Sequence, residues 1–504
     1  MKTEHKTLDS GALGVRQLIF LVIATVSPMT VVFGLFPLSM NFGNGIGVSG
    51  IYIFIAAIWL FYSVGYTNMA RYVRNTGSFY AYIAQGLGRP FGISSSYIAL
   101  LAYNSFLISN AGFIGYAVNN LLHSHFGINI DWWVYSLIAL ILIGFIGYRH
   151  LEVGTKILSI LMFMEIGILL LLSIVALFNP SPEGFTTAPY NPHVIFSGSF
   201  GIALAFCFQS FMGFEATSVF SEEVKNPYRS VPLATYWTVI VLGVFYVLVS
   251  YAIIVGWGKH GLIIKLNEAF GPNGDPSSIF KDLANQLLGG WSGSVFQILL
   301  ITSVFAATLS MQSVTTRYFL SCGRTNLLPK MIAKVHPKFG SPYVANVFQS
   351  LLTISFIIVT AIVGLDPYVQ VMGWFGGFGA ITLLLLYSLT SIAIIGFFLR
   401  TKMDTRVWHT KIAPGIASIG LIGGTTLTFL HFDLLFGEGQ TLLVSVMLLS
   451  ILFLGILGII IGLWFRKNQP ELYEQIGSSI AQSEESLSNS EMKNLETAVS
   501  KSDM

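Results

Sequence analysis

The stretch QSFMGFEATSVFSEEVKNPYRSVP, residues 209–232, places one carboxylate, Glu215, within an apolar segment and two residues after a glycine, Gly213. The apolar run begins near Phe196 and contains no other charged residue before Glu222, so Glu215 lies about halfway along a segment long enough to span a bilayer. An ionisable side chain at that depth costs roughly 2.5 to 3.5 kcal/mol on insertion scales, and it usually faces a cavity or a partner. The stretch therefore predicts a membrane helix with a transport site near its middle.

The composition extends this prediction to the whole chain. Of its 504 residues 54% are hydrophobic and only 10% are charged, against roughly 25% charged in soluble domains. The mean hydropathy is +0.72. A net charge of +3 is too small to suggest nucleic acid as a partner. The two cysteines, Cys207 and Cys322, predict neither a disulfide framework nor a cysteine metal site. We therefore predict a multi-pass membrane protein whose surroundings are the lipid bilayer.

A membrane-spanning helix needs about 20 mostly apolar residues, and twelve segments meet this requirement. Their approximate limits are 16–40, 47–70, 91–118, 132–148, 153–178, 196–222, 232–257, 291–317, 343–364, 368–399, 411–431 and 440–466. The sequence thus predicts an all-α membrane protein with a transmembrane transport domain over residues 16–466. Residues 1–15 form a cytoplasmic N-terminal segment, and residues 467–504, rich in Ser, Glu, Gln and Asn, form a disordered cytoplasmic tail.

The positions of the basic residues give an independent test of this topology, because cytoplasmic loops are enriched in Lys and Arg. With both termini placed in the cytoplasm, all of the 26 Lys and Arg residues except Lys259, Lys265 and Lys281 fall in predicted cytoplasmic segments. These three lie in one long external loop between the seventh and eighth helices, and long loops obey the rule least. An even number of helices in the cell membrane follows, with both termini in the cytoplasm.

Two of the predicted helices contain residues that interrupt a helix at similar depth. In the first helix these are Ser27, Pro28, Met29 and Thr30, and Pro28 cannot donate the main-chain hydrogen bond of a continuous helix. In the sixth helix Gly213 precedes the carboxylate. Main-chain groups freed at such breaks must be met by protein, substrate, ions or water. The five-helix interval between the breaks fits two inverted repeats with a binding site between them, although either break alone is also typical of a purely structural kink.

A second carboxylate, Glu165, lies near the middle of the predicted fifth helix with no basic residue nearby in the sequence. Burial at this depth favours the neutral form of a carboxyl group, so Glu165 is a candidate proton carrier unless a cation lies beside it. Ser303 on the eighth helix is a candidate hydrogen-bond or ion-site partner. The alternative for all of these groups is helix packing through hydrogen bonds.

Amide and aromatic side chains complete the predicted pocket. Asn104 and Asn110 on the third helix and Gln209 on the sixth are polar groups in apolar segments. Phe211 and Phe214 are suited to excluding water or stacking on a cationic group, although aromatic residues in membrane helices more often serve packing. Because no metal-ligand cluster, nucleophile–base pair or phosphate-binding loop stands out, we expect neither an enzyme nor a bound cofactor or metal.

Three stretches resemble the amino acid-polyamine-organocation superfamily of permeases. They are GFE with the following SEEVKNPYRSVP, RYFLSCGRTNLLPKMIAKVHPKFGSPYVAN at residues 317–346, and GSFYAYIAQGLGRPFG at residues 77–92. The resemblance covers roughly residues 10–465. It implies a five-plus-five inverted repeat with broken helices 1 and 6, two additional helices, and alternating access to a central site.

The same resemblance implies that substrate binds against the two breaks. The residues concerned are Val26, Ser27, Pro28, Met29 and Thr30 at the first break and Phe211, Gly213, Phe214, Glu215 and Ala216 at the second, with Asn104 added from the third helix. The SPMT sequence of the first break departs from the glycine-rich break that holds a substrate carboxylate in many amino acid permeases. It is more similar to the first break of putrescine importers, whose diamine substrate would suit a negative Glu215.

These observations predict a proton-coupled permease for amino acids or related amines, with Glu165, Glu215 and Ser303 taking part in coupling. Sodium is a less favoured coupling ion, because no dense set of oxygen ligands surrounds Glu165. Two alternatives stay open at this point. One is a polyamine or diamine importer or exchanger, and the other, from a different class, is a membrane receptor that senses an amine. The sequence indicates no oligomeric state.

Overall fold

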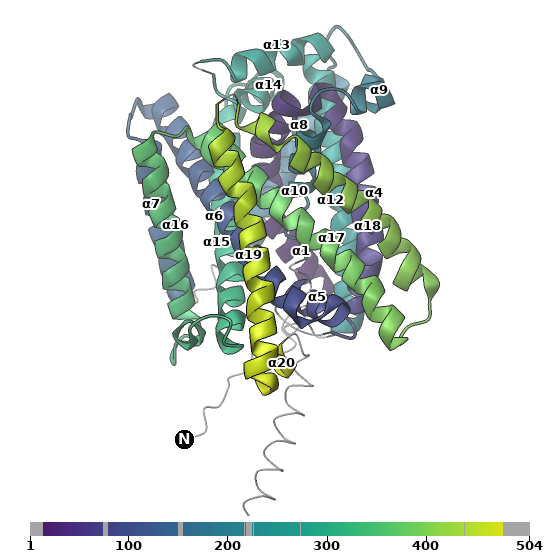
Figure 1. Cartoon of the computed structure of the whole chain (residues 1–504). Helices are drawn as coiled ribbons and strands as arrows, with labels where there is room; N and C mark the ends of the chain where they lie inside the picture. Colours follow the sequence, from purple (N-terminus) through teal and green to yellow (C-terminus); the bar gives the residue numbers. More distant parts are fainter. Residues whose placement is uncertain are drawn as a thin grey trace, which may run out of the picture.

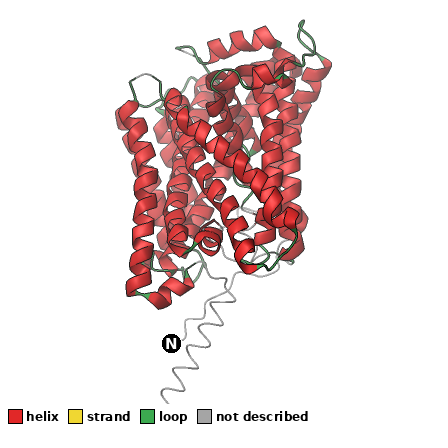
Figure 2. Cartoon of the chain, turned by 45° about the vertical axis from the view of Figure 1, so that its right-hand side comes forward, coloured by secondary structure: helices red, strands yellow, loops and turns green. Residues whose placement is uncertain are grey.

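The computed structural model describes residues 14–73, 79–149, 155–215, 217, 224, 226–272, 274–437 and 439–476. The elements that it defines are helices, and the long ones among them are roughly aligned in one bundle (Figures 1 and 2). The long helices are α4 (Val48–Met69), α6 (Arg89–Phe126), α7 (Trp132–Arg149), α8 (Thr155–Phe178), α12 (Pro227–Trp257), α15 (Ser292–Arg324), α16 (Tyr343–Val363), α17 (Phe375–Thr401), α18 (Ala413–Leu430) and α19 (Thr441–Asn468).

Shorter elements connect or interrupt these helices. They are α1 (Val15–Val26), α2 (Pro28–Thr30), η1 (Val31–Leu35), α3 (Phe36–Leu38), η2 (Ser39–Asn44), η3 (Gly45–Gly47), α5 (Phe79–Leu87), η4 (Ala188–Tyr190), α9 (Pro192–Ile195), α10 (Phe200–Gln209), α13 (Lys259–Ala269), α14 (Ser278–Leu288), η6 (Lys330–Ala333), η7 (Pro367–Trp374), η8 (Trp408–Ile412), η9 (Phe432–Leu435) and α20 (Pro470–Gln475). Residues 477–504 of the predicted tail lie outside the described residues, whereas α20 is a helix within its first part.

Ten helical stretches among the described residues are long and apolar enough to cross a membrane. The all-α, multi-pass architecture predicted from the sequence is therefore confirmed. One of the ten, Pro28–Met69, contains parts of the first two predicted segments, and the sixth predicted segment is represented by α10, which is shorter. The count of twelve spans and the inverted repeat stay predictions.

Close packing within the bundle relies on small residues, as is usual between membrane helices. The contact of α19 with α6 is an example. A Cβ atom added to Gly458 would lie 2.3 Å from the Cα atom of Ser94, and one added to Gly462 would lie 2.7 Å from the Cα atom of Pro90. The outer side of α19 exposes large apolar side chains such as Leu442 and Phe453. Such a surface suits contact with lipid tails rather than water.

The helices α13 and α14 cover the end of the bundle that is uppermost in Figure 1. The sequence predicted only a long loop for this segment, between the seventh and eighth membrane helices. The α14 helix buries Ile279, Phe280 and Leu283, whose spacing places them on one face. The Phe280 ring packs against Phe33 of η1, with 5.2 Å between the ring centroids, and against Phe36 of α3, at 6.2 Å. The α14 helix therefore lies over the chain that follows the first interruption.

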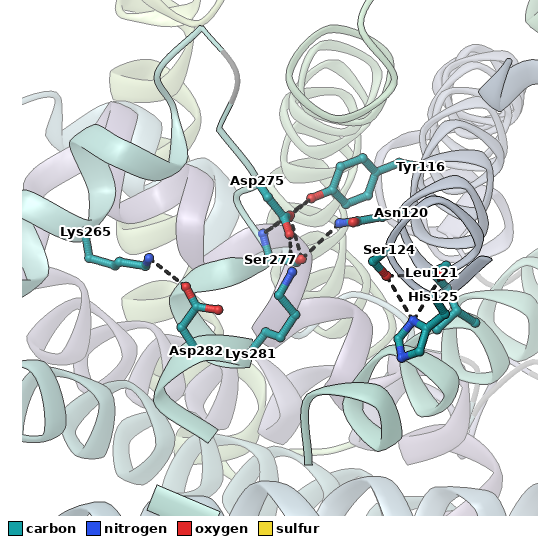
Figure 3. A network of polar contacts seen from close by, with 10 residues as sticks. All are labelled: Tyr116, Asn120, Leu121, Ser124, His125, Lys265, Asp275, Ser277, Lys281 and Asp282. Carbon is teal, nitrogen blue, oxygen red and sulfur yellow. Dashed lines mark hydrogen bonds and ion pairs between the residues drawn. The ribbon is translucent and has the colours of Figure 1, made fainter. Parts of the chain in front are cut away.

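A polar network attaches the start of α14 to α6 (Figure 3). The Asp275 carboxylate forms an ion pair with Lys281 at 2.6 Å and accepts hydrogen bonds from the Ser277 hydroxyl, also at 2.6 Å, and from the Tyr116 hydroxyl. Burial raises the pKa of Asp275, but the charge of Lys281 and these hydrogen bonds outweigh burial and hold the pKa below its usual value. The network is thus built around an ionised carboxylate.

Candidate substrate and coupling site

The first interruption of the bundle lies between α1 and α2. Ser27 separates these helices with φ 57° and ψ 76°, a left-handed conformation that is uncommon for a residue other than glycine. Pro28 occupies the first position of α2, where its missing N–H is not needed by the helix. The chain therefore changes course within the membrane-spanning part of the protein without leaving a proline inside a continuous helix.

The second interruption follows α10, which ends at Gln209. Residues 210–215 form turns, and Gly213 has φ +112°, a conformation that side-chain-bearing residues rarely adopt. The Oε2 atom of Glu215 accepts hydrogen bonds from the Gly213 N–H at 2.8 Å and from the Tyr387 hydroxyl at 2.6 Å. The main-chain carbonyl of Glu215 accepts a third from Tyr66 at 3.3 Å. Glu215 thereby attaches the second interruption to α17 and α4.

Aromatic rings enclose the Glu215 side chain, which is 4% exposed. The Tyr387 ring lies 4.6 Å from Trp59 and 5.8 Å from Phe214, measured between centroids, and it is stacked on Phe214. Phe211 belongs to a different cluster, with Tyr246 at 5.5 Å. The two phenylalanines that flank Gly213 therefore pack in separate groups.

The two interruptions lie side by side. A Cβ atom added to Gly213 would come within 3.3 Å of both the Thr25 and the Val26 side chains. Nearer the α14 end, a Cβ atom added to Gly43 would come within 2.7 Å of the Ala203 Cβ atom. The absence of a side chain at these two glycines allows α10 and the turns that follow it to approach the first interrupted helix closely, α10 after the break at Gly43 and the turns before it at Thr25 and Val26.

A cavity of about 50 Å³ opens beside the two interruptions, which is room for several water molecules. It is lined by Thr25, Val26, Thr30, Val31, Leu35, Phe106, Ser109, Asn110, Gln209, Met212, Ala307, Met311 and Met372. None of these described lining residues has an ionisable side chain. We call this space the central cavity.

Glu165 of α8 lies behind the first interruption, on a smaller cavity of about 10 Å³. Its Oε2 atom accepts a hydrogen bond of 2.7 Å from the Ser303 hydroxyl of α15, and its carboxyl group is also hydrogen-bonded to the main chain of Met29. The Ser303 hydroxyl is in turn hydrogen-bonded to the Ser27 hydroxyl, and Ser27 lies 2.7 Å from the hydroxyl of Thr30. Because Thr30 lines the central cavity, an unbroken series of polar groups joins Glu165 to it.

The residues predicted to bind substrate do not all reach the central cavity. Val26 and Thr30 line it, and Ser27 lines the smaller cavity beside Glu165. Glu215, Phe211 and Phe214 are absent from the described linings of both cavities. Pro28 and Met29 are buried within α2. Ala216 lies outside the described residues.

Asn104 was also predicted to contact substrate, but its amide is occupied elsewhere. Its Nδ2 atom donates to the Leu100 carbonyl at 2.7 Å, and its Oδ1 atom accepts from Gln349 at 2.9 Å. Asn110, six residues further along α6, lines the cavity instead.

Sequence reasoning did not single out the three methionines of the cavity, Met212, Met311 and Met372, because nothing in an apolar segment marks the side that faces a cavity. Among the described residues, no group of three or more His, Cys, Asp and Glu side chains is arranged to hold a metal ion.

A bundle of apolar helices with two adjoining interruptions at a polar-lined cavity defines a multi-pass membrane protein with an internal site for a small molecule. Residues 13–481 match the model of the amino acid permease family, and the chain belongs to this family. The predicted resemblance to the permease superfamily is thus confirmed, and the protein is a permease rather than an enzyme.

Individual relatives are more distant. The chain is 26% identical over 410 residues to a branched-chain amino acid permease of Bacillus subtilis (strain 168), covering 78% of this chain and 81% of the relative. It is 23% identical over 435 residues to a lysine-specific permease of Lactococcus lactis subsp. cremoris (strain MG1363), covering 80% and 81%. It is 32% identical over 210 residues to a methylthioribose transporter of Bacillus subtilis (strain 168), covering 41% and 42%.

Proposed function

We propose that this permease is a secondary active transporter that moves amino acids or related amines across the cell membrane by alternating access, with protons as the coupling ions. The observation that carries the proposal is the meeting of both helix interruptions at one cavity. Interrupted helices free main-chain N–H and C=O groups near the middle of the membrane, and such groups suit the charged ends of an amino acid. The family membership and the names of the relatives support a substrate of this class.

Proton coupling is supported by the surroundings of Glu165. Glu165 is 4% exposed, and no ion pair with its carboxyl group occurs among the described residues. The hydrogen bond from Ser303 continues through Ser27 to the first interruption. A change in the protonation of Glu165 would therefore act on the part of the chain that borders the substrate site.

The orientation in the membrane is also part of the proposal. We place the end of the bundle that carries α5 and α20 in the cytoplasm. Arg71 and Arg89 lie close to α5, and Arg400 lies near the end of α17, which contacts α5 through Gly396 and Gly86. Basic residues accumulate on the cytoplasmic side of membrane proteins. Both chain termini then lie in the cytoplasm, and α14 covers the external end of the central cavity.

The test is uptake of radiolabelled amino acids and diamines into liposomes that contain the purified protein. An inward proton gradient is expected to drive accumulation, and a protonophore is expected to abolish it. A sodium gradient that drives uptake where the proton gradient does not would overturn proton coupling. Binding without uptake or exchange under any gradient would overturn transport and favour the receptor alternative.

The diamine alternative depends on a carboxylate that meets the substrate. In this structure the Glu215 carboxylate is bonded to Gly213 and Tyr387 and is absent from the described lining of the central cavity. The structure therefore offers no specific support for a diamine over an amino acid. Competition between putrescine and a set of amino acids in the same liposomes separates the two substrates.

A further inference from the structure

The amide of Gln209 is an unused hydrogen-bonding group at the central cavity. Gln209 is the last residue of α10 and lines the cavity just before the second interruption. Its Oε1 atom is buried and has no hydrogen-bond partner among the residues that the structure describes. A buried acceptor without a partner costs roughly 1 to 3 kcal/mol, so a free oxygen at this position needs an explanation.

The neighbouring hydroxyl groups of the cavity wall are already engaged with the protein. Ser109 donates to the Met372 carbonyl at 2.8 Å, and Thr25 is hydrogen-bonded to Ser310 at 3.0 Å. Thr30 is bonded to Ser27. Unlike these groups, the Gln209 oxygen has no hydrogen-bond partner among the described residues, and because the atom itself is buried, a ligand in the cavity would reach it through a small movement of the amide.

The space around this amide is kept open by Gly376 of α17. A Cβ atom added at Gly376 would lie 3.1 Å from Nε2 of Gln209 and 3.0 Å from the Ser109 hydroxyl. Contacts of this length are tighter than most real Cβ contacts. A side chain at position 376 would therefore push the Gln209 amide away from its place.

The other lining residues carry no charge, and most are apolar; the amide of Asn110 is the remaining polar side chain. Val31, Leu35, Met212, Met311 and Met372 supply aliphatic and thioether groups, and flexible methionine side chains adapt to apolar ligands of different shape. No described lining residue offers a counter-charge to a cationic side chain. A lysine side chain or a second amine would enter this cavity without a partner, at a large desolvation cost.

We propose that Gln209 is a specificity-determining residue, whose side-chain oxygen accepts a hydrogen bond from the substrate's amino group, and that the cavity selects amino acids with an uncharged, apolar side chain. This inference rests on the proposed transport function. The physical basis is that a buried acceptor rejects an analogue without a matching donor, because the acceptor is then left unpaired. A hydrogen bond that involves a charged group corresponds to roughly 10- to 100-fold in affinity.

The experiment measures binding of L-leucine to the purified, full-length protein and its displacement by L-lysine and by 4-methylpentanoate, which is leucine without its amino group. The wild type is expected to bind leucine more tightly than either competitor. The Gln209→Met variant, which keeps an unbranched side chain of similar size, is expected to bind leucine roughly 10- to 100-fold more weakly and 4-methylpentanoate unchanged. Gln297→Met is the matched control, because Gln297 of α15 is a buried glutamine that does not line the cavity and whose amide nitrogen has no partner within the described part of the chain.

Three results would overturn the inference. The first is unchanged leucine binding in Gln209→Met. The second is an equal loss of leucine and 4-methylpentanoate binding in the same variant, which would indicate a merely structural role for Gln209. The third is tighter binding of lysine than of leucine by the wild type. Gly376→Ala gives a second route if Gln209→Met does not assemble. It displaces the amide without removing it and is expected to weaken leucine binding selectively, and unchanged binding there also contradicts the inference. A wild type that neither binds nor transports any amino acid or amine refutes the proposed function itself.

Discussion

Replacing Tyr387 by phenylalanine tests whether Glu215 holds the second interruption in place. The change removes one hydroxyl group, which donates to the Glu215 carboxyl at 2.6 Å, and leaves the ring stacked on Phe214 and packed against Trp59. Both residues are buried. Loss of a hydrogen bond to a charged or strongly polar group costs roughly 1.5 to 3 kcal/mol, so the unfolding equilibrium constant is expected to rise about 10- to 100-fold. Equilibrium unfolding in mixed detergent micelles measures this change.

The matched control is Tyr246→Phe. The Tyr246 hydroxyl is also buried, among the rings of Phe36, Tyr52 and Phe211, but no described residue forms a hydrogen bond with it. Removing it deletes a polar atom without breaking a bond, which is expected to leave stability unchanged or slightly increased. If the two variants unfold with the same free energy, the Glu215–Tyr387 bond does not stabilise the second interruption and the reasoning is wrong.

Three further variants test other parts of the structure. Glu165→Gln is expected to retain amino acid binding and to lose the pH dependence of uptake in liposomes; uptake that still follows pH as in the wild type removes Glu165 from coupling. Asp275→Asn is expected to lower the unfolding free energy by roughly 1.5 to 3 kcal/mol at neutral pH by breaking the Lys281 ion pair. Because the pKa of Asp275 is lowered by folding, the difference from the wild type should persist above the ordinary aspartate pKa and vanish as the pH falls through the lowered value; a difference constant down to strongly acidic pH would contradict this account. Gly213→Ala is expected to cost roughly 1 to 3 kcal/mol and to impair transport, because φ +112° strains any side-chain-bearing residue. Gly167→Ala, in a helix with open space around it, should be close to neutral, and equal effects of the two alanines would refute the argument from backbone strain.

The multi-pass helical fold was predictable because each membrane helix is determined by a continuous apolar stretch of the sequence. Each spanning helix satisfies its own main-chain hydrogen bonds, so an apolar run of sufficient length is enough to identify one. The interruption sites were also open to local reasoning, since proline cannot continue a helix and glycine tolerates a positive φ. The helices α13 and α14 were not predicted by this reasoning. They are 11 residues each and carry charged residues on their exposed sides, so a search for membrane spans passes over them.

The details of the site depend on which sides of distant helices meet, and this is decided by packing rather than by local sequence. Glu215 and its partner Tyr387 are 172 residues apart, and nothing around Glu215 in the sequence indicates that its carboxyl group is hydrogen-bonded to a tyrosine of α17. Asn104 and Asn110 are equivalent by composition, yet only Asn110 faces the cavity. The sequence made Ser303 a candidate hydrogen-bond or ion-site partner, and in the structure its hydroxyl donates to Glu165.

The hydroxyl groups between Glu165 and the central cavity have a directional property. An ionised carboxylate can only accept hydrogen bonds, and each hydroxyl has a single proton to give. When Glu165 is ionised, Ser303 must donate its proton to the carboxylate, so Ser27 donates to the hydroxyl or the main-chain carbonyl of Ser303, and Thr30 donates to Ser27 or Ser303. Thr30 then presents only its lone pairs to the cavity. A proton on Glu165 releases this constraint and allows the donors between Glu165 and Thr30 to reverse, so that Thr30 becomes able to donate a hydrogen bond toward the central cavity as well as to accept one.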